Sequence, residues 1–256
     1  MILDIKGVSK DFGGLRALDD VHIKVEEGDI LGLIGPNGSG KSTLLNIITG
    51  FLPLTTGAIM YRGEQISGLS PYTITPRGIA RTFQITSIFP NLTITENVIA
   101  GMYLKAKNSI WGSFFRTKAC RREEMELRRK AAEILRSTLG LQNREDTIAK
   151  NSAIGEQRNL EIAIALATDP ELLLLDEPAA GLNPTEVEQL MSLLISLHKR
   201  GVTLLIVEHN MKMVMQLCTR IVVLDYGRKI AEGTPKEIAS NSNVISIYLG
   251  RGQGSV

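Results

Sequence analysis

The segment Gly35-Pro-Asn-Gly-Ser-Gly-Lys-Ser-Thr43 has the residue types and the spacing of a phosphate-binding loop. It fits the pattern G-x-x-x-x-G-K-[ST], in which glycines let backbone N–H groups curl around phosphate oxygens. Lys41 is expected to reach the β- and γ-phosphates, and the Ser42 hydroxyl to ligate Mg²⁺. A helix that starts at the end of the loop adds its positive N-terminal dipole. The candidate nucleotide-contacting residues are Gly35, Asn37, Gly38, Ser39, Gly40, Lys41, Ser42 and Thr43.

An acidic pair ends a second apolar run, Leu172-Leu-Leu-Leu-Asp-Glu177. A buried strand would deliver Asp176 to the phosphate site, where its carboxylate can hold Mg²⁺ through water. Glu177 follows directly and is placed to polarise an attacking water as a general base. Alone, such a pair could be a surface feature at the end of a strand. Together with the phosphate loop it predicts nucleotide hydrolysis.

Two further polar residues follow strand-like runs and are candidates for the same site. Gln84 comes after Ile79-Ala-Arg-Thr-Phe83, and His209 comes after Val202 to Val207 and Glu208. Ligands of α/β proteins collect at strand ends, so either side chain could reach the γ-phosphate or the attacking water. Taken singly, such a residue is more often a loop residue without a role.

The elements that must position these residues alternate between strand and helix, which indicates a mostly parallel sheet. Met1 to Glu27 reads as short strands. The stretch 86–161 has a helical pattern and is predicted to be a subdomain inserted into a single domain, whose nucleotide-binding core is formed by 1–85 and 162–256. Other predicted strands are Ile30–Ile34, Ile79–Gln84, Leu172–Leu175, Val202–Val207 and Ile221–Leu224, and predicted helices include Ser42–Thr49 and Pro184–Lys199.

The composition limits the classes of protein that need to be considered. Of the 256 residues, 43% are apolar and 22% are charged, as in soluble globular proteins. The formal net charge of +2 gives no strong field that would attract nucleic acid. Cys120 and Cys218 are the only cysteines, which fits neither a disulfide framework nor a zinc site, and Cys218 is predicted to be a small core residue. No signal peptide is recognisable, and no apolar run approaches the ~18 residues of a membrane span, so the chain is expected not to cross a membrane itself.

The order of the motifs resembles the ATPase subunits of the ABC transporter family over nearly the whole chain. It comprises the phosphate loop, Gln84, Asn151-Ser-Ala-Ile-Gly-Glu-Gln-Arg158, Asp176-Glu177 and His209. The resemblance implies an α/β fold of the P-loop NTPase (RecA-like) type. In that fold a mostly parallel core sheet carries an N-terminal antiparallel β subdomain and an inserted α-helical subdomain. It also implies ATP and Mg²⁺ as cofactors, and hydrolysis of ATP to ADP and phosphate.

The resemblance also implies roles for single residues. Phe12 matches the aromatic residue that stacks on adenine, Gln84 the glutamine that senses Mg²⁺ and couples to the membrane domain, and His209 the histidine that contacts the γ-phosphate. Pro178 to Asn183 matches the loop at the dimer interface, with Asn183 where aspartate is more usual. The predicted catalytic residues are Lys41, Gln84, Glu177 and His209, and the predicted metal-binding residues are Ser42, Gln84 and Asp176.

The family's signature pattern, Leu-Ser-Gly-Gly-Gln, is altered in this chain. Aligned on the glycine, the segment reads Ser152-Ala153-Ile154-Gly155-Glu156, so Ala153 stands where a serine usually donates to the γ-phosphate held by the partner. Ala153, Gly155 and Glu156 are still predicted to contact nucleotide, because backbone N–H groups and the following helix N-terminus remain. The lost hydroxyl contact costs about 1 kcal/mol and predicts a working but slower site.

Several segments narrow the resemblance to the ATPase subunits of branched-chain amino acid importers. They are Ala153–Arg158, Leu160–Ala163, Asp176–Pro184, Arg81–Gln84, Asn243–Gly250 and the charged insertion Tyr103–Arg129. This likeness implies a second ABC ATPase in a homo- or heterodimer, two transmembrane permease subunits and an extracytoplasmic substrate-binding protein. It implies a peripheral location on the cytoplasmic face of the inner (cell) membrane, and no nucleic-acid partner.

Other assignments stay open at this point. Urea and amide importers have closely similar ATPases. A soluble ABC ATPase of DNA repair or translation usually carries a long coiled coil or two ATPase halves, and neither is evident. A P-loop kinase would leave Gln84, the signature segment and His209 without a role, and a nucleotide-gated regulator without turnover would require a severe loss at the signature. Trp111, Phe114 and Phe115 either pack on their own subdomain or contact membrane subunits.

Overall fold

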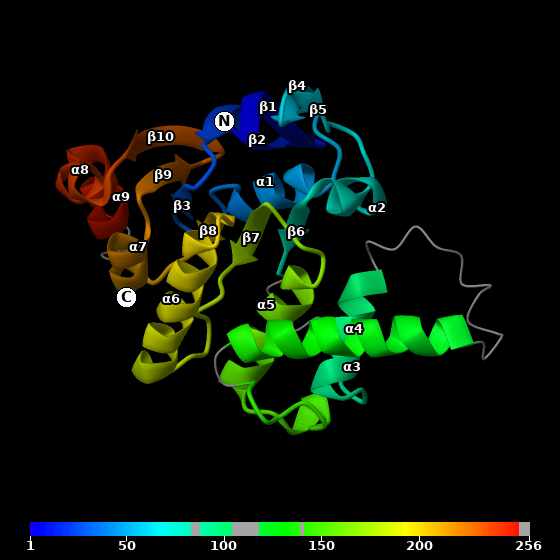
Figure 1. The fold of residues 1–256 in the computed structure, drawn as a ribbon. Helices are drawn as coiled ribbons and strands as arrows, with labels where there is room; N and C mark the ends of the chain where they lie inside the picture. Colours follow the sequence, from blue (N-terminus) through cyan, green and yellow to red (C-terminus); the bar gives the residue numbers. More distant parts are fainter. Residues whose placement is uncertain (83–87, 104–117, 139–140, 251–256) are drawn as a thin grey trace.

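The computed structural model describes residues 1–82, 88–103, 118–138 and 141–250 of the chain (Figure 1). The strands are β1 (Leu3–Phe12), β2 (Leu15–Val25), β3 (Ile30–Ile34), β4 (Thr56–Tyr61), β5 (Glu64–Gln65), β6 (Ile79–Arg81), β7 (Leu172–Asp176), β8 (Thr203–Val207), β9 (Arg220–Asp225) and β10 (Arg228–Gly233). The helices are α1 (Lys41–Ile48), α2 (Pro71–Ile74), α3 (Ile94–Tyr103), α4 (Lys118–Ser137), α5 (Ile154–Leu166), α6 (Pro184–Lys199), α7 (Met211–Leu217), α8 (Pro235–Ser240) and α9 (Ser242–Gly250), with 3-10 turns η1 (Thr75–Arg77) and η3 (Ala149–Asn151).

A six-stranded sheet in the order β10-β9-β3-β8-β7-β6 forms the centre of the molecule. All its pairings are parallel except that of β10 with β9, which confirms the predicted mostly parallel sheet. Because β3, β8 and β7 are neighbours and run in the same direction, their carboxyl ends meet at one edge of the sheet. The segments that follow these three strands are the phosphate loop, the residues leading to His209, and Glu177.

The central strands are buried on both faces, which explains their uninterrupted apolar sequences. In β7, Leu172 and Leu174 point into the core shared with α1 and the second sheet, whereas Leu173 and Leu175 point into the core shared with α6 and α7. The same alternation holds in β3 and β8, as the period of two in a strand requires. Helix α1 is therefore enclosed between the two sheets (Figure 1).

The second sheet is antiparallel, in the order β2-β1-β4-β5, and confirms the predicted N-terminal β subdomain. The expectation of short strands within the first 27 residues was wrong, because β1 has 10 residues and β2 has 11. Irregularities between Ile5 and Val8 and around Lys10 shift the register of the β1–β2 pair. These shifts interrupt the period-two pattern of the sequence without ending the pairing.

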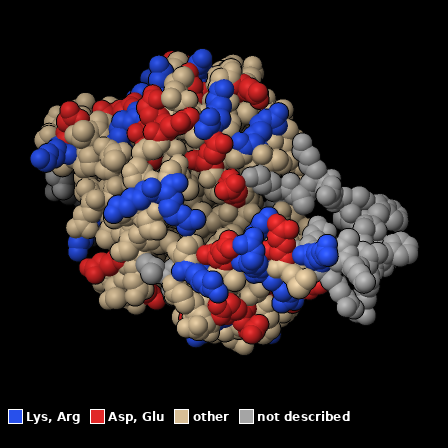
Figure 2. Space-filling model, in the orientation of Figure 1, with Lys and Arg blue, Asp and Glu red and all other residues tan. Residues whose placement is uncertain are grey.

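Helices α3, α4 and α5 surround a third group of buried apolar side chains, including Ile94, Val98, Leu135 and Leu160. Helix α4 is exposed along most of its length, and acidic and basic side chains alternate on it (Figure 2). Three ion pairs at i,i+4 spacing lie along it, namely Glu124–Arg128, Glu126–Lys130 and Arg129–Glu133. Such pairs support an exposed helix by a few tenths of a kcal/mol each. The division of the chain at 86–161 stays a prediction, and its C-terminal limit falls inside α5.

Strand β6 is shorter than the sequence predicts, and Cys218 lies beside a helix end. The predicted strand Ile79–Gln84 ends at Arg81 in the structure, although the Thr82 N–H still donates to the carbonyl of Leu174 at 3.0 Å. Cys218 is buried, as predicted, and directly follows the last residue of α7. Among the helices of the described part of the chain, none is long and apolar enough to cross a membrane.

Candidate nucleotide-binding site

The phosphate loop joins β3 to α1, and its two fixed glycines are required by their neighbours. Gly35 has φ 151°, and a Cβ there would lie 2.1 Å from the carbonyl oxygen of Leu224 in β9. Gly40 has φ 102°, and a Cβ there would lie 2.7 Å from the carbonyl oxygen of Ala17 in β2. Both φ values favour glycine and both positions lack space for a side chain. The motif is therefore held between β9 and the β1–β2 hairpin.

Hydrogen bonds tie the loop to the turn between β9 and β10. The Gly227 N–H donates to the carbonyl of Ser39 at 3.1 Å, and the Asp19 N–H donates to the carbonyl of Gly227 at 2.9 Å. Ser39 is almost fully buried, whereas Asn37 and Gly38 are exposed at the tip of the loop. The loop thus has a fixed base and an accessible tip.

Lys41 opens α1 and is 95% buried, with 5% of its surface exposed. Its ammonium donates to the carbonyls of Gly35 at 2.8 Å and Pro36 at 2.9 Å. Burial lowers the pKa of Lys41, and the negative charges of Glu177 and Asp176 partly oppose that effect. The charge is therefore enclosed by the loop that is predicted to hold the phosphates. Ser42 is exposed and Thr43 is half-buried in the first turn of the same helix.

Asp176 ends β7 and is 3% exposed. Its Oδ2 accepts a hydrogen bond from Nη2 of Arg81 at 2.9 Å, in an ion pair that is buried on both sides. Its Oδ1 is buried and has no hydrogen-bond partner within the described residues. A buried carboxylate oxygen without a donor is costly unless a cation or water satisfies it. The donor set therefore fits a hydrated Mg²⁺ held at Oδ1.

Glu177 follows on a sharply turned backbone with φ 49°. Its N–H donates to the carbonyl of Val207 at 2.9 Å, which extends the β7–β8 pairing by one step. Its Oε1 lies 3.0 Å from Nε2 of His209. A positive φ at a non-glycine residue costs on the order of 1 kcal/mol or more and is commonly found at functional sites. The structure therefore brings together Lys41, Asp176, Glu177 and His209, four of the predicted site residues.

Sequence reasoning missed Glu208, which is 4% exposed and directly precedes His209. Its carboxylate accepts three backbone N–H bonds, from Ala179 at 2.7 Å, His209 at 2.9 Å and Asn210 at 3.1 Å. It thereby ties the segment after Glu177 to the segment that carries His209. The sequence signal that could have found Glu208 is an acidic residue directly after the apolar run that ends at Val207. Arg81 was also missed as a site residue, although its motif had been noted.

The altered signature segment forms the N-terminus of α5. Ala153 is the N-cap residue, with an extended backbone and no side-chain cap. The Glu156 carboxylate accepts from the Ala153 N–H at 3.1 Å and pairs with Arg144 at 3.2 Å. A Cβ on Gly155 would lie 2.7 Å from the carboxylate of Glu186, which caps the start of α6. The signature segment therefore packs against the first turn of α6.

Phe12 lies at the end of β1 with 45% of its surface exposed. The Nζ atom of Lys10 lies 5.0 Å from the centre of its ring. An aromatic ring with this exposure has surface available for stacking on a base, and the role of Phe12 at adenine stays a prediction. Gln84 and the aromatic residues Trp111, Phe114 and Phe115 lie outside the described residues.

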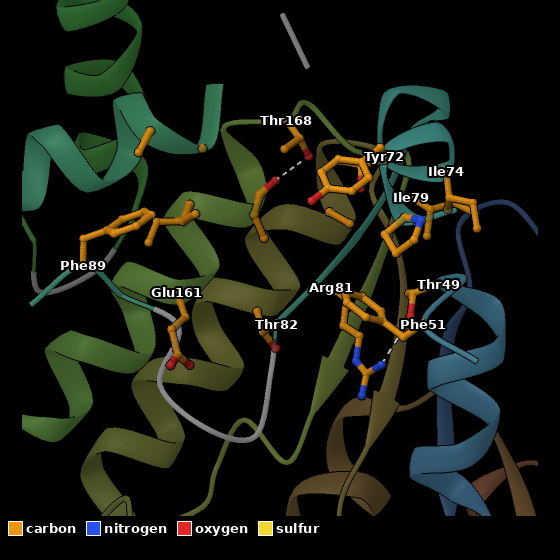
Figure 3. A pocket seen from close by; sticks show the side chains of 17 residues that line it. Thr49, Phe51, Tyr72, Ile74, Ile79, Arg81, Thr82, Phe89, Glu161 and Thr168 are labelled. Carbon is orange, nitrogen blue, oxygen red and sulfur yellow. Dashed lines mark hydrogen bonds between the residues drawn. The ribbon is translucent and has the colours of Figure 1, made fainter. Parts of the chain in front are cut away.

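An apolar groove of about 360 Å³ lies between the core and the helical part of the molecule (Figure 3). Three of its aromatic side chains are well exposed, Phe51 at 52%, Tyr72 at 85% and Phe89 at 52%. Thr82 and Phe89 also line it, and they lie on either side of residues 83–87 in the chain. The residues that flank positions 83–87 in the sequence therefore both belong to the groove.

The fold and this arrangement of residues define a P-loop nucleotide-binding protein. Comparison with known proteins places it more closely. Residues 18–180 match the family described as ABC transporter, and residues 228–253 match the family described as branched-chain amino acid ATP-binding cassette transporter. The chain belongs to the ABC transporter family and is an ATPase of that family.

Two curated relatives show how far the similarity extends. The high-affinity branched-chain amino acid transport ATP-binding protein BraF of Pseudomonas aeruginosa is 42% identical, over 97% of this chain and 98% of its own length. The high-affinity branched-chain amino acid transport ATP-binding protein LivG of Escherichia coli K12 is 40% identical, over 97% of this chain and 98% of its own length.

Solved structures agree with this placement. A nucleotide-free ATP-binding cassette from an ABC transporter superimposes with a TM-score of 0.85 at 35% identity, covering 96% of this chain and 98% of its own. The ADP conformation of an ATP-binding cassette of an ABC transporter superimposes with a TM-score of 0.85 at 36% identity. The match covers 97% of this chain and 98% of the other.

Proposed function

We propose that this chain is the ATP-binding and ATP-hydrolysing subunit that energises an importer of branched-chain amino acids. The proposal is supported by the Glu177–His209 pair beside the phosphate loop, together with full-length similarity to relatives named for branched-chain amino acid transport. The match of the C-terminal residues 228–253 to the branched-chain amino acid family supports the same substrate class.

The chain's own residues divide the work of hydrolysis. Glu177 accepts a proton from the attacking water, and His209, 3.0 Å away, orients that carboxylate and contacts the γ-phosphate. Lys41 leaves its carbonyl partners to neutralise charge on the β- and γ-phosphates. Phe12 stacks on the adenine. Gln84 senses the metal and couples the site to the membrane subunits.

The metal site uses groups that the fold already presents. Ser42, Gln84 and Asp176 would hold the ion, Asp176 through its Oδ1, which has no hydrogen-bond partner among the described residues. When bound, Mg²⁺ supplies positive charge that stabilises the phosphates during transfer. The buried position of Asp176 strengthens this interaction, because water screens it little.

The working unit is a dimer of two such ATPases. Each ATP lies on one phosphate loop and is covered by the signature segment of the other chain, here Ala153 to Glu156. ATP therefore acts as an interface ligand, and its binding favours the closed dimer. Hydrolysis removes the γ-phosphate contact, and the dimer opens. The partner is a second ABC ATPase, either identical or related.

The apolar groove is the docking site for an amphipathic helical segment of a permease subunit. Its exposed aromatic side chains, Phe51, Tyr72 and Phe89, offer an apolar contact surface larger than an isolated surface residue provides. Arg81, which lines the groove and pairs with Asp176, connects docking to the nucleotide site. Two permeases, an extracytoplasmic binding protein and a peripheral position on the cytoplasmic face of the membrane complete the proposed assembly.

Purification of the tagged chain from its own membranes tests this proposal. Two multi-span permeases, a second ATPase and an extracytoplasmic binding protein should co-purify. The binding protein should then bind leucine, isoleucine or valine. A binding protein that prefers urea or an amide would change the substrate, and a purely soluble set of ribosomal or DNA-repair partners would overturn the transport function.

A further inference from the structure

Arg81 is a buried arginine that joins three elements around the nucleotide site. Its Nη2 donates to Asp176 at 2.9 Å, at the end of β7. Its Nη1 donates to Oδ1 of Asn46 at 2.7 Å and to Oγ1 of Thr49 at 3.3 Å, at the end of the helix that follows the phosphate loop. Only 6% of its side chain is exposed. One guanidinium therefore fixes the orientation of the Asp176 carboxylate relative to α1.

The orientation matters because the two carboxylate oxygens of Asp176 have different surroundings. Oδ2 is taken by Arg81, and Oδ1 has no partner in the described part of the chain. As long as Arg81 holds Oδ2, the free oxygen is the one available to a hydrated cation. A carboxylate that rotated out of this pair would lose its charge partner in a buried place, which is unfavourable.

The same arginine also forms part of the apolar groove. Thr49, Arg81 and Thr82 all line it, and Figure 3 shows Arg81 beside Thr49 and Phe51 at one end of the pocket. No intermediate residue is needed between the groove and Asp176, because a single side chain touches both. A segment seated in the groove would press on the strand and the helix end that hold the guanidinium.

We propose that Arg81 is a positioning residue through which a segment seated in the groove controls the Mg²⁺-holding carboxylate of Asp176. The regulatory half of this inference rests on the proposed docking of a permease at the groove. The positioning half does not, because the ion pair exists in the free chain. Arginine is needed because its planar fork reaches both partners at once, whereas the point charge of lysine does not.

The first test separates binding of the metal from turnover. Affinity for the fluorescent analogue mant-ATP is measured in EDTA and during a Mg²⁺ titration, for the wild type, Arg81→Lys and the matched control Arg77→Lys. Arg77 is an exposed arginine in η1, four residues away. In EDTA, the affinity of Arg81→Lys for mant-ATP should stay within twofold of the wild type. In the Mg²⁺ titration, the Mg²⁺ concentration that gives half of the change in mant-ATP affinity should be at least fivefold higher than for the wild type. Arg77→Lys should match the wild type.

A Mg²⁺ titration of Arg81→Lys that equals the wild type would overturn the positioning role. Thermal unfolding shows whether each variant is folded. If Arg81→Lys is not, Asn46→Ala decides, because it removes the 2.7 Å bond to the guanidinium and keeps the ion pair. A rise of at least twofold in the Mg²⁺ requirement of Asn46→Ala supports the role, and an unchanged requirement contradicts it.

The second test addresses the groove and uses the purified permease complex. In the wild-type complex the Mg²⁺ requirement should differ from that of the free chain by at least threefold, and in the Arg81→Lys complex this difference should vanish. An equal difference in both complexes would overturn the regulatory role. Co-purification of Phe89→Ala with the permeases tests docking alone. Unchanged co-purification would place the permease elsewhere, and the first test would still decide the role of Arg81 in the free chain.

Discussion

The position of the Glu177 carboxylate depends on its own backbone and on two neighbours. The residue turns out of β7 with φ 49°, its N–H is held by Val207, and its Oε1 lies 3.0 Å from His209. This geometry points the carboxylate away from the buried strand and leaves the side chain 20% exposed. A base that is partly exposed but held at two points suits the activation of a water molecule.

Replacement of Glu177 by glutamine should abolish turnover without preventing ATP binding. The amide keeps the shape and one contact to His209 but has no basic oxygen, so steady-state ATPase activity should fall by about 10²–10⁴-fold. The variant should accumulate as an ATP-bound dimer, measurable by sedimentation. Glu188→Gln, an exposed acid on α6, is the matched control. Normal hydrolysis by Glu177→Gln would refute the role.

At the residue scale, the signature segment departs from the family pattern Leu-Ser-Gly-Gly-Gln at its serine, which is Ala153 here. Ala153 caps α5 without a side-chain acceptor, and Glu156 supplies a carboxylate that already binds the Ala153 N–H. Its negative charge is partly neutralised by Arg144. A serine at position 153 would restore both a helix cap and a donor to a bound γ-phosphate.

Ala153→Ser should therefore raise ATP-driven dimerisation about fivefold, the equivalent of about 1 kcal/mol for one added hydrogen bond, and should speed turnover. It should also stabilise the fold by about 1 kcal/mol through capping. Ala153→Gly separates the two effects, since glycine caps nearly as well but brings no hydroxyl. Unchanged dimerisation and turnover in Ala153→Ser would contradict a signature contact at this position.

At the scale of elements, the segment after β7 and the segment after β8 form one unit. Glu208 joins them through hydrogen bonds to Ala179 on one side and to His209 and Asn210 on the other. Three backbone donors to one buried carboxylate make a strong and directional link. A movement of the loop after Glu177 is thereby transmitted to His209.

Glu208→Gln should lower kcat about tenfold with less than a twofold change in KM for ATP, because one accepting oxygen becomes a donor that faces a donor. A tenfold loss corresponds to about 1.4 kcal/mol. Combined with His209→Ala, the substitution should add little further loss. Glu237→Gln is the control, since Glu237 also accepts a backbone N–H, from Thr234, in α8. Fully additive losses would show that Glu208 does not act through His209.

The elements were largely predictable where one physical constraint dominated. The strands β3, β7 and β8 are apolar except at the ends of β7 and β8, because both of their faces are buried. Helix α6 was predicted with its observed limits from Pro184 and its apolar spacing. The β1–β2 hairpin was predicted less well, since register shifts disturb its alternation.

The site was predictable in its motifs and less so in its connections. Residue types and spacing identify the phosphate loop, Asp176 and Glu177 in the sequence, because phosphate binding restricts the residue types allowed. Arg81 and Glu208 do not, because their roles depend on partners 95 and 29 residues away along the chain. Which side chains meet at an edge of a sheet follows from strand order, and one sequence does not fix that order.

At the scale of the whole molecule, two apolar cores on either face of the central sheet hold the site in place, and Cys218 belongs to one of them. Burial raises the pKa of its thiol to about 12, from an ordinary value of 9.0, and the charge of Glu208 adds to the effect. Between these values the unfolded chain loses the thiol proton and the folded chain keeps it. The unfolded state then binds fewer protons, so stability falls as the pH rises.

This linkage predicts a difference between the wild type and Cys218→Ala. From pH 9 to pH 10, the free energy of unfolding of the wild type should fall by about 1 kcal/mol more than that of the variant. Urea unfolding at both pH values measures it, and other groups with raised pKa values, such as Tyr61, cancel in the comparison. Parallel pH profiles of the two proteins would show that the thiol is not protected by burial.

Uptake of labelled leucine by cells of the source organism, with Glu177→Gln replacing the native residue, tests the central claim most directly. Initial uptake rates of leucine, isoleucine and valine should fall at least tenfold, with the protein present at its normal level in the membrane fraction. Uptake of an unrelated amino acid should not change, and Glu188→Gln cells should behave as the wild type. Normal uptake of all three amino acids in Glu177→Gln cells would contradict the account.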